Sequence, residues 1–261
     1  ILDKMIYNDY YGKIDLSMSD SNVGARKNRN IRDHLFVLNG VINNVKNGDA
    51  EATDIQLYDI AKCFDKMWFK ESMNGLYEAG MNDDKFSLIY ELNKQTKIMV
   101  KTPVGNTDEF QINENVMQGG VWGPLMCSIE IDQIGKECIE NGDNVYKYKD
   151  CVALSTLAMI DDLAGIAKCG CDSIMLNSYI NTKIKSKKLT CGADKWKTLH
   201  ISKKKNDIKN CNELRSVGFQ QENKMKNVDS EKYLGDYISN DGSNDINIEE
   251  RWKSELELCH K

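Results

Sequence analysis

Acidic residues interrupt two apolar segments of this chain, and their positions restrict its possible folds more than any other feature. Asp59 ends the segment IQLYD, and the adjacent pair Asp161-Asp162 lies within the later apolar run LAMIDDLAGIA. Two carboxylates about 4 Å apart repel each other by roughly 4 kcal/mol at an effective dielectric near 20. A divalent cation turns that repulsion into binding, and oxygen ligands of this kind suit magnesium. The pattern therefore predicts a fold that brings both acidic sites to one cation.

The composition is that of an ordinary globular protein. The chain has 261 residues, of which 29% are charged and 41% hydrophobic, enough for one large domain or two small ones. No stretch approaches the length of apolar sequence that a transmembrane helix needs, so we expect no membrane partner. The first residues lack a signal sequence and do not include a starting Met. We expect a fragment of a longer intracellular protein, in the cytoplasm or the nucleus, of undetermined oligomeric state.

The cysteines and the net charge restrict the function further. Nine scattered cysteines indicate reduced thiols, and Cys169-Gly-Cys171 lacks the second ligand pair that a zinc site would need. The net charge of −5 argues weakly against nucleic-acid binding. Basic residues are nevertheless concentrated in segments 26–32 and 183–205. Each segment fits either a solvated face or a nucleic-acid contact.

The periodicity of apolar residues predicts an α+β fold with a mostly antiparallel sheet packed on helices. The hairpin over 151–167 has Asp161-Asp162 at its bend, so the end of strand 54–59 can lie beside it. The full set of predicted elements comprises helices over 31–46, 66–79, 84–95, 121–139, 172–188 and 246–258, strands over 54–59, 197–202, 214–219 and 232–238, and hairpins over 97–112 and 151–167.

Two further features accompany the acids. Phe64 stands five residues after Asp59 and is either a core residue or a ring placed beneath a nucleotide sugar. In the second position it would exclude a 2′-hydroxyl and select deoxynucleotides. The glycine-rich segment 118–124 precedes a predicted helix and is either a connecting loop or a loop that approaches a base or a template.

Taken in order, the segments YDIAKCFD, VMQGGVWGPL, MIDD, GADKWKTLHIS and EKYLGDYIS resemble the successive motifs of reverse transcriptases, which are RNA-directed DNA polymerases. They are most similar to those of non-LTR retrotransposons, and GARKNRNIRDHL resembles the fingers motif of the family. The resemblance covers residues 20–240. It implies a right-hand polymerase palm, with partial fingers over 1–50, a palm with inserted fingers elements over 51–240, and the start of a thumb or connecting helix over 241–261.

The resemblance also implies an RNA template, a DNA primer and dNTP as partners, and two Mg²⁺ ions, with Mn²⁺ as the alternative. The matched positions divide by role into catalytic metal ligands (Asp59, Asp161, Asp162), a sugar gate (Phe64), nucleotide or template contacts (Gln118, Gly119, Lys195, Arg26, Arg32) and a primer grip (Tyr233, Leu234, Gly235).

The chain departs from the family pattern near the acids. Met159 stands where Phe or Tyr is usual, and Ile160 replaces a smaller residue. Met117 and Gly123 are further departures, on either side of the Gln118-Gly119 pair. They put activity rather than fold in question. Two alternatives to RNA-templated DNA synthesis therefore stay open: a catalytically inactive retroelement remnant that binds nucleic acid, and RNA-templated RNA synthesis, against which Phe64 argues.

Overall fold

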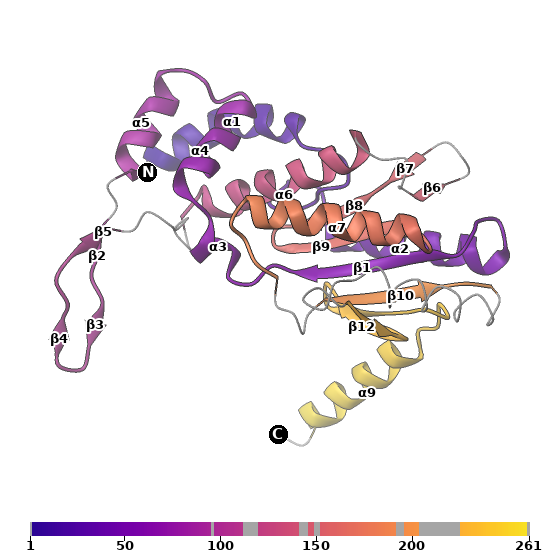
Figure 1. The fold of residues 1–261 in the computed structure, drawn as a ribbon. Helices are drawn as coiled ribbons and strands as arrows, with labels where there is room; N and C mark the ends of the chain where they lie inside the picture. The colour runs from indigo at the N-terminus through magenta and orange to yellow at the C-terminus, as the bar shows by residue number, and fades with distance from the viewer. Residues whose placement is uncertain are drawn as a thin grey trace.

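A five-stranded sheet forms the centre of the molecule (Figure 1). The computed structural model describes residues 2–94, 97–111, 120–140, 146–148, 152–191, 196–203 and 225–259. The strand order is β11-β10-β1-β9-β8, and all neighbours are antiparallel except β10 and β11. The strand bounds are β1 (Thr53–Asp59), β8 (Thr156–Met159), β9 (Asp162–Lys168), β10 (Lys197–Ile201) and β11 (Lys226–Val228).

The two faces of this sheet are covered by different elements. Helices α6 (Gly123–Glu140) and α7 (Cys171–Ser186) lie over one face (Figure 1). Helix α2 (Ile31–Asn47) and the hairpin of β12 (Ser230–Tyr233) and β13 (Asp236–Ser239) pack on the other. Strand β1 is buried on both faces along almost its whole length, and Asp59 at its end is only partly buried.

A second group of helices extends the core beyond α6. It contains α1 (Leu2–Ser17), α3 (Cys63–Lys66), α4 (Phe69–Glu78) and α5 (Asp84–Asn93). Helix α1 buries Ile6, Tyr10 and Ile14 in the same core cluster as α4 and α6. Helix α1 is not among the elements predicted from the sequence, although this spacing of four residues is helical.

Local capping explains where α2 begins and ends. The Asn30 side chain accepts a hydrogen bond from the Arg32 N–H, and the Asp33 carboxylate accepts one from the Asn30 N–H. This reciprocal pair is a capping box. At the other end, Gly48 has φ 85° and satisfies the last carbonyls.

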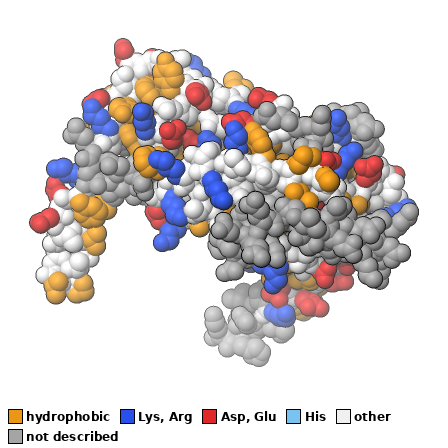
Figure 2. All heavy atoms as spheres, in the orientation of Figure 1, with side chains coloured by type: hydrophobic (Ala, Val, Ile, Leu, Met, Phe, Trp, Pro, Cys, Tyr) orange, Lys and Arg blue, Asp and Glu red, His pale blue; other side chains and the backbone are white. Residues whose placement is uncertain are grey.

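A narrow hairpin projects away from the body of the molecule (Figure 1). It consists of β2 (Lys97–Ile98) paired with β5 (Phe110–Gln111), and β3 (Lys101–Thr102) paired with β4 (Gly105–Asn106). Figure 2 shows hydrophobic side chains on it, and Val104 and Phe110 are exposed. The remaining elements are the pair β6 (Tyr146–Tyr148) and β7 (Val152–Leu154) and the C-terminal helix α9 (Asp245–Cys259). Within the described residues, no helix is long and apolar enough to cross a membrane.

Most predicted elements are confirmed, including helices α2 and α5 and the hairpin around Asp161-Asp162. The helix predicted over 66–79 was wrong at its start, because Met67 is extended and buries its side chain, so that α4 begins at Phe69. The strand predicted over 232–238 was also wrong, because the chain reverses at Leu234-Gly235. The strand predicted over 214–219 lies outside the described residues.

The prediction of reduced thiols holds for the free cysteines that the structure describes, namely Cys63, Cys127, Cys138, Cys171 and Cys191. It was wrong for Cys169, which is disulfide-bonded. Sequence spacing could not show this, because folding alone decides which cysteines approach each other.

Candidate active site

The sheet register brings the predicted catalytic acids to one place. Asp59, the last residue of β1, lies directly opposite Asp162, the first residue of β9. Opposed residues of an antiparallel pair point to the same face, with Cβ atoms roughly 5 Å apart. Asp161 precedes Asp162 in the turn from β8, and its carbonyl accepts a hydrogen bond from the Ile60 N–H at 3.3 Å. All three acids are partly exposed at the same end of the sheet.

The turn that carries Asp161 has a strained backbone. Ile160, the residue between β8 and Asp161, has φ 56°. The left-handed region costs an L-residue about 1–2 kcal/mol, and a β-branched residue is a clear outlier there. Surrounding structure must therefore hold this turn in place.

The segment Asn22–Gly24 supplies that support. The Val23 N–H donates to the Ala158 carbonyl at 2.9 Å, so the segment runs alongside β8. A Cβ on Gly24 would lie 2.5 Å from the backbone nitrogen of Ile160, so the chain passes directly against the strained turn.

Ser128 of α6 fixes this segment from the other side. Its hydroxyl contacts the Gly24 carbonyl at 2.7 Å and Asn22 Oδ1 at 3.0 Å. The supporting role of Asn22, Gly24 and Ser128 was not predicted from the sequence, because only the fold brings residues 22–24 and 128 to the turn.

Buried groups around the acids show the negative potential of the site. Burial raises the pKa of the Cys191 thiol to about 12, and the Asp59 charge contributes. The hydrogen bond with Cys63 and burial raise the pKa of Cys127, with a smaller contribution from Asp161. Burial also raises the pKa of the Tyr233 hydroxyl, again assisted by Asp162. The charges of Asp59, Asp161 and Asp162 thus reach the buried groups around them.

Phe64 lies in α3, immediately beyond the end of β1. It is partly buried and packs against the large core cluster. Its neighbour Cys63 is fully buried, with its sulfur 2.8 Å from that of Cys127 on α6. Contacts of this kind fix α3 relative to the acids, while Phe64 as a whole is only partly buried.

The predicted primer-grip residues form the turn of the β12–β13 hairpin. Tyr233 pairs with Asp236 and is 4% exposed, whereas Leu234 and Gly235 have φ 51° and 93°. Two successive positive φ angles are typical of a type I′ hairpin turn. Burial is the main cause of the raised pKa of Tyr233, and the charge of Asp162 adds to it, so the hydroxyl lies within electrostatic range of that acid.

The remaining predicted contacts differ in accessibility. Arg26 is engaged internally: its side chain is 4% exposed, and its Nε lies 2.8 Å from Asp15 Oδ1. Further hydrogen bonds join it to the Ser19 and Asn22 carbonyls. Arg32 is exposed in the first turn of α2. The predicted contacts Gln118, Gly119 and Lys195 lie outside the described residues.

The lysine-rich segment is partly neutralised. Lys183 forms an ion pair with Glu137, and Lys187 lies 2.6 Å from Glu130. Figure 2 accordingly shows basic and acidic side chains intermixed on the face in view. These two lysines help to join α7 to α6. Part of the lysine-rich segment therefore has a structural role that needs no nucleic acid.

The donor set at the sheet end suits a hard divalent cation. Asp59, Asp161 and Asp162 offer only carboxylate oxygens, which magnesium and manganese prefer. Within the described ranges, however, the group whose ligand atoms all lie within 4.8 Å of one another is Asp54, Cys169 and His200 rather than these three acids. The ligand type and the sheet register of the three acids suit a divalent cation. Their side chains must move closer to one another before all three can bind the same ion.

A family comparison accounts for the arrangement. Residues 1–238 match the family model described as reverse transcriptase (RNA-dependent DNA polymerase). The chain belongs to the reverse transcriptase family. A search of curated proteins found no match.

Solved telomerase structures share this reverse transcriptase fold. Apo telomerase from Candida tropicalis, truncated from its C-terminal domain, has a TM-score of 0.60 and 13% identity, covering 90% of this chain and 43% of that one. Telomerase from Candida albicans with the TWJ fragment of telomeric RNA has a TM-score of 0.54 and 13% identity. That match covers 93% of this chain and 36% of the telomerase chain. At this identity the likeness concerns the fold. The chain spans less than half of the length of these telomerase chains. Its fold is an α+β palm, with an antiparallel sheet packed on helices.

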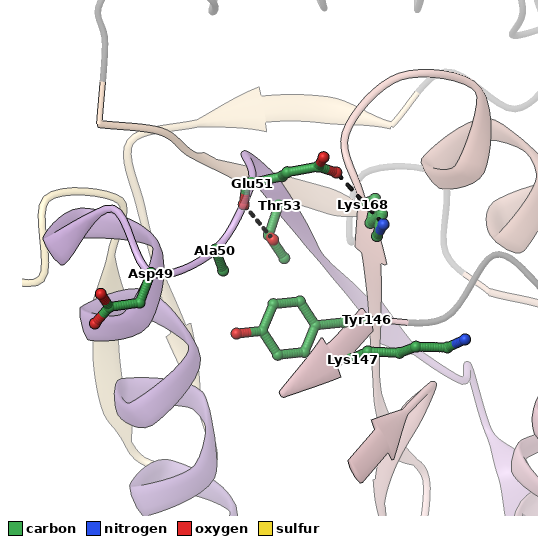
Figure 3. A pocket seen from close by; sticks show the side chains of 7 residues that line it. All are labelled: Asp49, Ala50, Glu51, Thr53, Tyr146, Lys147 and Lys168. Atoms are coloured by element: carbon green, nitrogen blue, oxygen red, sulfur yellow. Dashed lines mark hydrogen bonds and ion pairs between the residues drawn. The ribbon is translucent and has the colours of Figure 1, made fainter. Parts of the chain in front are cut away.

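A pocket of about 180 Å³ lies at the opposite end of β1 from the acids (Figure 3). Lys168 and Glu51 form an ion pair across it at 3.4 Å. Its lining includes two acidic and two basic side chains. The lining residues are Asp49, Ala50, Glu51, Thr53, Tyr146, Lys147 and Lys168.

Proposed function

We propose that this chain is the reverse transcriptase domain of a retroelement, similar to those of non-LTR retrotransposons. It would extend a DNA primer on an RNA template by transferring nucleotides from dNTP. The observation that carries the proposal is the pairing of Asp59 with Asp162 across β1 and β9, with Asp161 in the adjoining turn. Family membership supports the reaction class.

In this proposal the three acids act as metal ligands and not as general bases. Two Mg²⁺ ions, or Mn²⁺ in their place, would lower the pKa of the primer 3′-hydroxyl and neutralise charge on the triphosphate. The rigid end of β1 fixes Asp59, and the strained turn buttressed by Asn22–Gly24 fixes Asp161 and Asp162. Such preorganised ligands align the hydroxyl with the α-phosphate and the departing pyrophosphate.

The residues around the acids would bind the substrates. The partly exposed Phe64 ring would lie beneath the sugar and exclude a 2′-hydroxyl. The turn at Tyr233, Leu234 and Gly235 would hold the primer end, and the electrostatic effect of Asp162 on Tyr233 supports this role. Gln118, Gly119, Lys195 and the exposed Arg32 would contact nucleotide or template. Arg26 would act there only if it exchanged its contact with Asp15.

An RNA template is supported by the similar telomerase structures that contain a fragment of telomeric RNA. The division into partial fingers over 1–50, palm over 51–240 and the start of a thumb over 241–261 belongs to the same proposal. Helix α9 begins at Asp245, close to the last of these boundaries.

Primer extension on an RNA template with Mg²⁺ tests the proposal. The wild-type chain should add dNTP, and the double variant Asp161→Ala/Asp162→Ala should add none above background while keeping its thermal transition. The matched control Asp108→Ala removes an exposed carboxylate from the projecting hairpin and should leave incorporation unchanged.

Two results would contradict the assignment. Incorporation that survives the loss of both acids would show that the catalytic ligands lie elsewhere. Salt-dependent RNA binding by a folded wild-type chain that incorporates nothing with either Mg²⁺ or Mn²⁺ would instead indicate an inactive, RNA-binding remnant.

A further inference from the structure

Two buried cysteines meet where the short helix α3 packs against the long helix α6. Cys63 is the first residue of α3 and is 1% exposed, and Cys127 lies near the start of α6 and is 0% exposed. Their Sγ atoms are 2.8 Å apart. Non-bonded carbon atoms lie about 3.5–4.0 Å apart, and sulfur is the larger atom. The two sulfurs are therefore closer than ordinary packing would place them.

We propose that Cys63 and Cys127 form an oxidation site, at which a peroxide converts the two thiols into a disulfide that links α3 to α6. Both cysteines are free thiols in this structure. The sulfur atoms of a disulfide lie about 2.05 Å apart, so the two sulfurs have to approach by only about 0.8 Å. The helices already bring the reacting atoms together.

The oxidation balances with hydrogen peroxide as the oxidant. The thiolate of one cysteine attacks a peroxide oxygen, and the O–O bond breaks to leave a sulfenic acid and one water molecule. The sulfur of the other cysteine then attacks the sulfenic sulfur, forms the S–S bond and releases the hydroxyl group as a second water molecule. Two thiols thus lose two hydrogen atoms, and one peroxide is reduced to two water molecules.

Local opening of α3 gives the peroxide access to these buried sulfurs. Helix α3 has four residues, and its N-cap residue Lys62 has φ 53° and makes no capping hydrogen bond with its side chain. Short elements of this kind open locally at a much lower free energy than the whole domain. Hydrogen peroxide is small, so a brief opening is sufficient.

The link has a consequence for the polymerase site, and this part of the inference rests on the proposed function. Phe64 follows Cys63 directly, so drawing Cys63 toward α6 displaces the ring of the proposed sugar gate. A misplacement of about 1 Å can reduce a rate by about 100-fold, and the shift here is smaller. The oxidised chain should therefore incorporate dNTP about 10-fold more slowly than the reduced chain.

Peptide mapping under non-reducing conditions tests the link without any nucleotide. The full chain is treated with hydrogen peroxide, its remaining thiols are alkylated in denaturant, and the digest is analysed by mass spectrometry. Wild type should give peptides joined through Cys63 and Cys127, about 10-fold more abundant than any joined through Cys63 and Cys191, because only contacting thiols have so high an effective concentration. Cys191 is the competing partner, since the charge of Cys63 contributes to its raised pKa.

Two variants complete the peptide map. Cys171→Ser removes an exposed cysteine and should form the link as wild type does. Cys127→Ala cannot form it. Recovery of Cys63 from oxidised wild type mainly as the alkylated thiol, as a sulfonic acid or as a disulfide with Cys191 would overturn the proposal, and this readout depends on wild type alone.

Primer extension before and after oxidation tests the consequence. The activity lost by the cross-linked wild type should return on reduction, and Cys127→Ala should keep its own rate after peroxide treatment. An unchanged rate in the cross-linked wild type, or an equal loss in Cys127→Ala, would refute the effect on the site. A chain that incorporates nothing in either state would contradict the proposed function, while the peptide map would still decide whether the link forms.

Discussion

Gly24→Ala tests whether the segment beside β8 positions the catalytic turn. The new methyl group would lie 2.5 Å from the Ile160 backbone nitrogen and in contact with Ser128 Oγ. Gly24 does not have a positive φ, so the effect is steric rather than conformational. The Ser128 hydroxyl can rotate, but the Ile160 backbone must move by roughly 1 Å to restore ordinary contact. Overpacking of this kind costs about 1–3 kcal/mol of stability.

The effect on catalysis should exceed the effect on folding. Asp161 follows Ile160 directly, so a shift of the turn displaces a proposed metal ligand. A misplacement of about 1 Å can reduce a rate by about 100-fold. We therefore expect primer extension to fall by about 100-fold, while urea denaturation shows a protein that is still folded at 25 °C.

Gly40→Ala is the matched control. Gly40 lies within α2, and a Cβ there meets nothing within 4 Å outside its own helix. Alanine should raise the free energy of unfolding by up to about 1 kcal/mol through helix propensity and leave incorporation unchanged. Full activity of Gly24→Ala, or an equal loss in Gly40→Ala, would refute the argument that residue 24 supports the turn.

Three other substitutions have defined outcomes. Phe64→Ala should lower discrimination against ribonucleotides by about 10- to 200-fold, the range expected for a steric pocket. The control Phe69→Ala removes another partly buried ring of the same core and should leave this discrimination unchanged. Equal selectivity in the two variants would refute the proposal that Phe64 excludes the 2′-hydroxyl. Burial lowers the His34 pKa from 6.5 to about 4 in the folded protein. As the pH falls, the His34 imidazole is therefore protonated in the unfolded chain before it is protonated in the folded one. Stability should drop by about 2 kcal/mol between pH 7 and pH 5, and His34→Gln should lack this part of the pH dependence in urea denaturation. Tyr233→Phe should raise the free energy of unfolding by about 1 kcal/mol, because the hydroxyl is buried with no hydrogen-bond partner in the described part of the chain; a clear loss of stability would show that the hydroxyl does have a partner.

Locally encoded features were predictable from the sequence. Asn30, Asp33 and Gly48 delimit α2, and Gly80 with φ 105° follows the helix that was predicted to stop there. The predicted strand over 54–59 and the acidic bend of the hairpin over 151–167 indicated that Asp59 and the 161–162 turn can lie side by side, and the sheet register confirms it.

Features that depend on tertiary contacts were not predictable in this way. Burial of Met67 moves the start of α4, and the core, rather than the local sequence, holds Ile160 and Leu234 at positive φ. The approach of Cys169 to His200 likewise depends on three strands that are distant in sequence.

The packing of α2 limits how far the chain can be shortened. Leu38, Val41, Ile42 and Val45 cover the face of the sheet formed by Ile55, Leu57 and neighbouring strand residues. A fragment that starts at residue 51, the proposed palm boundary, would expose this apolar face to solvent. Large exposed apolar surfaces lead to aggregation. A soluble minimal palm should therefore begin before Asn30, and its polymerase activity has to be assayed with α2 attached.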